Sequence, residues 1–195
     1  MFPNNIKHKK DTMIFYDKIS KSYDKLYGEE QKQKFSFTLH KGKFNFKGKI
    51  LDAGCGTGLF EEFIIKRMDR NNLFFCVDFS KKLLEKAKKK HRVKENIFLI
   101  CADIDKLPFP NNLFDVCVIF TVFQNLPNPN QTLEEIKRVC RKNALLVTTY
   151  LKTETNIENF KNFLGKIGFK PEVFDPPHLN EYVGFCKIFK YIKNV

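Results

Sequence analysis

The 195-residue sequence has no tryptophan and no Cys-x-x-Cys pair, and its apolar runs are short. VCVIF at 116–120, among the longest of them, falls far short of the ~20 residues that a membrane span needs. The N-terminus, MFPNNIKHKKD, is polar and basic and lacks the apolar segment of a signal peptide. We therefore expect a cytoplasmic protein without a membrane span.

The six cysteines stand apart, at positions 55, 76, 101, 117, 140 and 186. This spacing argues against a zinc ribbon or a redox motif, and a disulfide framework is not expected in a cytoplasmic chain. No cluster of His, Cys and Asp has the spacing of metal ligands, so we expect no metal site. The cysteines within apolar runs are expected to act as small hydrophobic residues.

The composition indicates one globular domain, with 43% hydrophobic residues and 22 phenylalanines. The formal net charge is +13, and basic residues concentrate in KKLLEKAKKKHRVK at 81–94. Such a field would attract nucleic acid such as RNA, acidic lipid or an acidic partner. The alternative is that these lysines form ordinary solvated helix faces.

Short apolar runs alternate with amphipathic segments along the chain. We expect strands at 49–53, 73–78, 96–103, 113–120 and 144–151, and a final pair within PEVFDP and YVGFCKIFKYI. We expect helices over 11–40, 59–68, 81–91 and 132–141, and one more that ends near Gly168. This alternation predicts an α/β fold whose doubly wound, mainly parallel sheet has helices on both faces.

The stretch ILDAGCGTGLFEEFI, residues 50–64, places Asp52 before glycines at 54, 56 and 58, at a predicted strand-to-helix junction. Glycine is costly inside regular structure, so three here indicate that a ligand approaches the backbone closely. Asp78 ends the next strand, where an acid can accept hydrogen bonds from both ribose hydroxyls. Up to this point NAD and S-adenosylmethionine both fit.

Two features favour S-adenosylmethionine over NAD. The loop is G-x-G-x-G rather than the dinucleotide fingerprint G-x-G-x-x-G. Asp52 beside it would repel a pyrophosphate but suits a cationic amino group. Asp103, after the third strand, can accept a hydrogen bond from an adenine amine. Three carboxylates around one ligand suit a molecule that carries a sulfonium and an ammonium.

At this level of detail the chain resembles a known family. ILDAGCGTG, VDFS, ADIDKLPFPNNLFDVCVIF and NPNQTLEEIKRV are similar, in this order, to the successive motifs of class I S-adenosylmethionine-dependent methyltransferases, over about residues 14–150. The closest subgroup includes ubiquinone and menaquinone C-methyltransferases. The resemblance implies a single Rossmann-like sheet of seven strands in the order 3-2-1-4-5-7-6, with the last strand antiparallel. YDKISKSYDKLYG is similar to the family's lid helices, which implies lid helices within residues 1–45 and the methyltransferase domain over 46–195.

The resemblance also implies roles for individual residues. The residues expected around the cofactor are Asp52, Gly54, Cys55, Gly56 and Gly58 at the methionine end, Asp78 at the ribose, Phe79, Asp103 and Ile104 at the adenine, and Phe120 and Thr121 at the sulfonium. No catalytic residue is identified. The candidates are Tyr16 and Tyr23 in the lid, Gln124 where the subgroup often has a histidine, and His178 in the turn DPPHLNEY. Where the family usually has a Pro-Gly-Gly turn, this chain has RKNA at 141–144.

Three functions are left open by these observations. The leading one is methyl transfer to a small-molecule acceptor. The second is methylation of RNA or of a translation-associated protein, with a small activator subunit paired to the apolar edge strand IFLIC at 97–101. The third is a non-catalytic scaffold that binds the cofactor.

Overall fold

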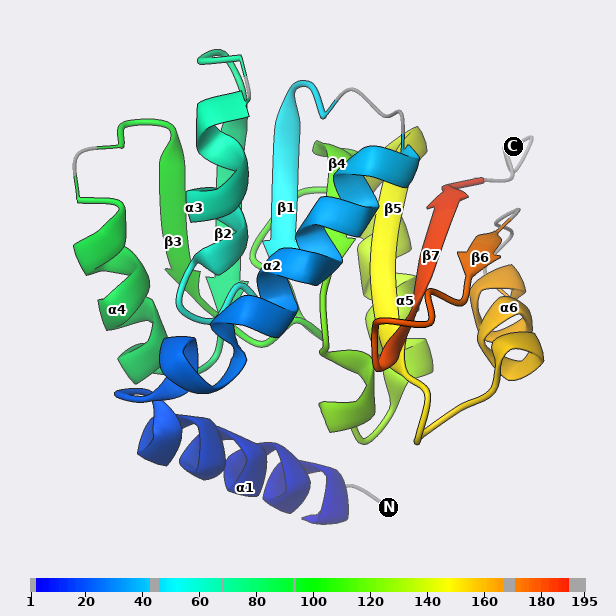
Figure 1. Ribbon diagram of the computed structural model, residues 1–195, viewed down its shortest axis with the longest axis horizontal. Helices are drawn as coiled ribbons and strands as arrows, with labels where there is room; N and C mark the ends of the chain where they lie inside the picture. The colour runs from blue at the N-terminus through cyan, green and yellow to red at the C-terminus, as the bar shows by residue number, and fades with distance from the viewer. Residues whose placement is uncertain (1–2, 43–45, 68, 93, 167–170, 190–195) are drawn as a thin grey trace.

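The computed structural model describes residues 3–42, 46–67, 69–92, 94–166 and 171–189. Its strands form one sheet in the order β3-β2-β1-β4-β5-β7-β6 (Figure 1). The strands are β1 (Lys49–Ala53), β2 (Leu73–Asp78), β3 (Ile97–Cys101), β4 (Phe114–Ile119), β5 (Cys140–Leu151), β6 (Glu172–Phe174) and β7 (Glu181–Lys187). Strands β1 to β5 pair in parallel, and β7 is antiparallel to both β5 and β6. The predicted fold class and strand order are confirmed.

Helices cover both faces of the sheet because its strands carry apolar side chains on both sides. The helices are α1 (Pro3–Ile19), α2 (Tyr23–Gly42), α3 (Leu59–Ile64), α4 (Lys81–Lys90), α5 (Pro129–Val139) and α6 (Ile157–Gly165), with short 3-10 turns η1 (Ile65–Arg67) and η2 (Phe123–Asn125). Leu133 of α5 and Phe160 of α6 belong to one core cluster, and Phe35 of α2 and Phe60 of α3 belong to the other. Figure 1 shows α1 running along the edge at which β1, β2 and β3 end.

The N-terminal helical segment differs from the expected single helix over 11–40. It begins at Pro3, a residue suited to the first helical position, and divides between Ile19 and Tyr23. Ser20 donates its hydroxyl to the carbonyl of Asp17 at 2.9 Å, and Ser22 donates to the carbonyl of Ile19 at 3.2 Å. These hydroxyls satisfy backbone carbonyls at the end of α1. Side chains that bond to the backbone in this way compete with helical hydrogen bonds and so favour a helix boundary.

The start of β5 also differs from the expectation. The strand begins at Cys140 rather than Ala144, so the expected helix over 132–141 ends earlier, at Val139. Asn143 has a φ of 64°, and the register of β4 and β5 shifts between Phe114 and Val116. Asparagine tolerates this left-handed conformation better than most residues, so RKNA forms an irregular strand entry without glycine.

The remaining expectations fall close to the observed elements. The expected helix end near Gly168 and the last residues of YVGFCKIFKYI lie outside the described residues. Of the helices in the described ranges, none has the length and apolar character required to cross a membrane.

Candidate active site

The glycine loop after β1 is built from left-handed backbone. Gly54, Gly56 and Gly58 have φ values of 90°, 55° and 73°. A β-carbon at Gly54 would lie 2.4 Å from Val122, and one at Gly58 would lie 2.6 Å from His91. At Gly56 the nearest atoms belong to Tyr23, at 4.0 Å. Internal packing therefore requires the first and third glycines, whereas the second leaves space open beside the loop.

Asp78 at the end of β2 is held firmly against this loop. One carboxylate oxygen accepts a hydrogen bond from the backbone N–H of Gly56 at 2.9 Å, and the other accepts from the N–H of Ser80 at 2.8 Å. Burial raises the pKa of Asp78 to about 6, and the backbone donors oppose that shift. The carboxyl group is therefore buried and fixed in place, yet it borders a pocket.

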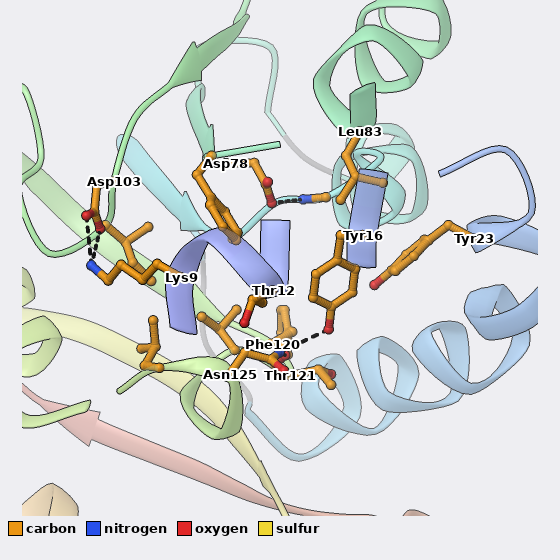
Figure 2. A pocket seen from close by; sticks show the side chains of 16 residues that line it. Lys9, Thr12, Tyr16, Tyr23, Asp78, Leu83, Asp103, Phe120, Thr121 and Asn125 are labelled. Atoms are coloured by element: carbon orange, nitrogen blue, oxygen red, sulfur yellow. Dashed lines mark hydrogen bonds and ion pairs between the residues drawn. The ribbon is translucent and has the colours of Figure 1, made fainter. Parts of the chain in front are cut away.

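The pocket lies at the carboxyl ends of the strands, where α/β folds bind ligands. Its lining residues come from α1 and the start of α2, from the ends of β1 to β4, from α4 and from η2 with its flanking residues (Figure 2): Lys9, Thr12, Tyr16, Tyr23, Gly54, Gly56, Asp78, Phe79, Leu83, Asp103, Ile104, Phe120, Thr121, Val122, Asn125 and Leu126. The fold thus brings together most of the residues predicted around the cofactor, with both lid tyrosines.

A second, smaller pocket adjoins the first and shares Tyr23, Gly54 and Phe120 with it. Asp52 and Cys55, both predicted at the methionine end, line this second pocket. Gly58 lines neither pocket, because it packs against His91, whose Nε2 lies 2.9 Å from the Gly58 carbonyl oxygen.

Glu61 of α3 is a neighbour of Asp52 that the sequence reasoning missed. Asp52 and Glu61 are 3% and 0% exposed, and burial together with the Glu61 carboxyl raises the pKa of Asp52 well above its usual range. Neither carboxylate oxygen of Glu61 accepts a hydrogen bond from an N–H or O–H donor of the described residues. A buried acidic pair of this kind fits a ligand that brings a positive charge, such as an ammonium group.

Helix α1, predicted to be part of a lid, is held beside the pocket by polar contacts. Nζ of Lys9 lies 2.7 Å from both carboxylate oxygens of Asp103 and 2.5 Å from Oδ2 of Asp105 (Figure 2). Desolvation lowers the pKa of Lys9, but its bonds to these two carboxylates outweigh that effect and raise it. Asp103, predicted to bind the adenine amine, therefore has its carboxylate bonded to a lid lysine in this conformation.

The four catalytic candidates are not placed together. Tyr16 and Tyr23 line the pocket, and the Tyr16 hydroxyl accepts a hydrogen bond from Nδ2 of Asn125 at 3.0 Å. Gln124 and His178 line neither of the two adjoining pockets. His178 is exposed, and its ring centroid lies 6.0 Å from that of Phe37. Burial raises the pKa of Tyr16 and of Tyr23, so both hydroxyls stay protonated at neutral pH.

Behind the pocket lies a buried polar cluster that the sequence reasoning did not identify. Lys34 of α2 forms an ion pair with Glu181 of β7, with 2.6 Å between Nζ and Oε2. The same Nζ donates to Oγ1 of Thr121 at 2.6 Å.

In the described part of the chain, no group of three or more potential metal ligands is assembled.

Comparison with known proteins gives the family context of this site. The family described as "Methyltransferase domain" matches residues 51–148. Demethylmenaquinone methyltransferase of Staphylococcus aureus is 31% identical over 148 residues, which are 74% of this chain and 61% of that protein. The match therefore spans less than two thirds of the length of these curated relatives.

Solved structures share the fold at lower sequence identity. A putative methyltransferase of Haloferax volcanii, in complex with the Trm112 methyltransferase activator, superposes with a TM-score of 0.75 at 13% identity, covering 90% of this chain and 98% of that one. Magnesium protoporphyrin IX methyltransferase of Synechocystis PCC 6803, solved with bound SAM, gives a TM-score of 0.70 at 15% identity, covering 91% and 97%.

Proposed function

The chain belongs to the class I S-adenosylmethionine-dependent methyltransferases, and we propose that it transfers a methyl group from S-adenosylmethionine to a small-molecule acceptor. The observation that carries the proposal is the pocket at the strand ends, where Gly56 leaves space beside a fixed, buried Asp78 carboxyl. The lid closes over that same space.

The residues of the two pockets suit the parts of this cofactor. Asp78 would accept hydrogen bonds from the ribose hydroxyls, with Phe79 and Ile104 beside the adenine. Asp52, which lines the second pocket next to the buried Glu61, would neutralise the ammonium group at the methionine end. When bound, S-adenosylmethionine supplies a methyl group already activated by its attachment to a positively charged sulfur.

The protein's own contribution to such a transfer is to position the two reactants and to shield them from water. Correct placement of two reactants can lower a barrier by about 7–11 kcal/mol. Tyr16 and Tyr23 reach over the pocket from the lid, and their protonated hydroxyls donate hydrogen bonds rather than accept protons. Helix α1, held by its bonds to Asp103 and Asn125, would shield the reacting groups from water.

A small acceptor is favoured by the way the pocket is enclosed. Lys9 and Tyr16 of α1 both line the pocket and bond to two other lining residues, Asp103 and Asn125, so α1 covers part of the pocket. A small molecule can be enclosed under such a lid, whereas a loop of RNA or protein would need α1 displaced. The curated relatives are named for demethylmenaquinone, which is itself a small molecule.

A macromolecular substrate is the second candidate, and two observations favour it. The net charge is +13, and among the described strands β3 pairs with β2 alone, with Phe98 of β3 42% exposed. An uncovered apolar edge can pair with another chain. The Haloferax volcanii structure, which shares the fold, was solved in complex with an activator.

Transfer of labelled methyl groups from S-adenosylmethionine into cell extract tests the proposal. The extract is separated into small-molecule, protein and RNA fractions, and the Asp78→Ala variant is the control. Label in the small-molecule fraction that depends on Asp78 is the expected result. Label in RNA or in one protein favours the second candidate. No transfer into any fraction would favour a non-catalytic scaffold.

A further inference from the structure

Thr121 follows β4 with a backbone conformation that is rare for its residue type. Its φ is 59°, and a β-branched residue adopts such a value only when its surroundings enforce it. Its N–H donates to Oγ1 of Thr149 at 2.9 Å, and its carbonyl accepts from Nδ2 of Asn125 at 3.1 Å. Backbone strain of this kind clusters at functional sites, and Thr121 lines the pocket.

The contacts of the Thr121 hydroxyl determine what it can do. Oγ1 accepts hydrogen bonds from Nζ of Lys34 at 2.6 Å and from Nε2 of Gln31 at 3.2 Å. A hydroxyl has two acceptor lone pairs and one proton, so both lone pairs are occupied and only the proton is left to bond. No acceptor for that proton is found among the residues that the structure describes. The hydroxyl is therefore a donor available to the pocket.

Lys34 strengthens this donor. Its ammonium group is buried and is paired with the equally buried Glu181. A hydrogen bond from a charged donor is about twice as strong as a neutral one and polarises the hydroxyl that accepts it. Lys34 does not line the pocket, so it would act on a ligand only through Thr121.

Tyr16 supplies a second donor beside the first. Nδ2 of Asn125 donates both to the Tyr16 hydroxyl, at 3.0 Å, and to the Thr121 carbonyl, at 3.1 Å. Figure 2 shows the Tyr16 hydroxyl pointing at Asn125, next to Thr121. Because the Tyr16 oxygen is already an acceptor, its proton is also free to be donated.

We propose that the hydroxyls of Thr121 and Tyr16 bind an anionic oxygen of the methyl acceptor, a phenolate or an enolate, with Lys34 as a positioning residue. The inference rests on the proposed function and names the acceptor class for the same pocket. An amine acceptor would present N–H donors to a site whose two hydroxyls are themselves donors. The charged and titratable groups near the two hydroxyls are Lys34 and Glu181 behind Thr121, Tyr23 and Tyr27 beside Tyr16 and, across the pocket, Asp78.

The probe for this subsite is 4-nitrophenol, whose absorbance distinguishes the phenolate from the phenol. It is titrated into the protein saturated with S-adenosylhomocysteine, with 4-nitroaniline as the neutral counterpart. We expect saturable binding of the phenolate form and a shift of the bound probe toward that form. Thr121→Val keeps the β-branched shape and should weaken nitrophenolate binding about tenfold or more, the loss typical of a hydrogen bond to a charged group. Thr121→Ser restores the hydroxyl and should recover most of that binding.

Three controls keep the result specific. Thr153→Val makes the same change at an exposed position outside the pocket. Binding of S-adenosylhomocysteine to each variant separates a lost acceptor contact from a lost fold. If Thr121→Val does not fold, Tyr16→Phe removes the other hydroxyl and leaves the Lys34 contact in place.

The inference is overturned if nitrophenolate does not bind saturably, if 4-nitroaniline binds as well, or if neither hydroxyl variant weakens binding. Methyl transfer into the extract fractions is measured separately. Transfer to small molecules without nitrophenolate binding would refute the anionic acceptor and leave the proposed function standing. Nitrophenolate binding without any methyl transfer would support the subsite and refute the proposed function.

Discussion

Nζ of Lys34 lies 2.6 Å from Oε2 of Glu181, and both side chains are shielded from solvent. Lys34 belongs to α2 and Glu181 begins β7, so the pair connects this helix to the sheet. Burying either charge without its partner would be costly, because in the pair each charge offsets the desolvation of the other. The pair also holds Thr121 at the pocket through the bond from Lys34.

Removal of one member of this pair should destabilise the protein more than removal of both. Lys34→Met leaves the Glu181 carboxylate buried without its cation and should lower the free energy of unfolding by about 3–5 kcal/mol. The double variant Lys34→Met/Glu181→Leu should recover most of that loss. Urea unfolding of the three proteins measures the difference. A double variant as unstable as Lys34→Met, or less stable, would show that the two charges do not compensate each other.

Affinity for the cofactor should depend on pH through Asp78. Its pKa is about 6 in the folded protein, above the ordinary value of 3.8. The raised value means that its contribution to stability is present below pH 3.8 and is lost as the pH rises through 6. The carboxylate accepts ribose hydrogen bonds best when ionised, so the dissociation constant of S-adenosylmethionine should fall as the pH rises through about 6. Calorimetric titration from pH 5 to about 8 measures it, and Asp78→Asn should abolish this dependence.

Gly56 and Gly58 of the loop should respond differently to replacement by alanine. Gly56→Ala places a methyl group in open space beside the loop, and the left-handed backbone should cost about 1–2 kcal/mol of stability while cofactor binding is lost. Gly58→Ala meets His91 at 2.6 Å and should be destabilised further. Thermal unfolding and cofactor titration of both variants test the contrast. Full cofactor affinity in Gly56→Ala would place the ligand away from the loop.

The contact of Lys9 with Asp103 should slow entry into the pocket. Lys9→Met removes the ion pair that holds α1 over the adenine end, and should raise the association rate of S-adenosylhomocysteine roughly fivefold, the equivalent of about 1 kcal/mol. The salt dependence of that rate should weaken as well. Stopped-flow mixing at two salt concentrations measures both effects. Lys10→Met, at the exposed neighbouring position, is the control and should behave like the wild type.

Much of the fold could be predicted because its determinants are local. Apolar runs that end in Asp52, Asp78 and Asp103 indicate parallel strands whose carboxyl ends meet, and the glycine spacing marks the loop between them. The motif order then implied the strand order that is observed. By contrast, the break between α1 and α2 depends on how Ser20 and Ser22 bond to nearby carbonyls, which residue periodicity does not reveal.

Lys34 and Glu61 could not be assigned to the site from the sequence, because their burial depends on contacts between distant segments of the chain. Lys34 stands in QKQKFSF, which has the composition of a solvated helix face, and its burial follows only from the position of Glu181. Glu61 likewise stands in an acidic pair, EE, typical of a helix surface. His178 was only one of four catalytic candidates; Leu179 takes the buried position beside it, and the histidine is exposed.

The most direct test of this account is calorimetric titration of the purified protein with S-adenosylmethionine, with NAD as the comparison ligand and Asp78→Ala as the variant. We predict saturable binding of S-adenosylmethionine at one site per chain, no comparable binding of NAD, and a marked loss of affinity in Asp78→Ala. Absence of binding, or binding that Asp78→Ala leaves unchanged, would contradict the assignment of the pocket on which every other proposal rests.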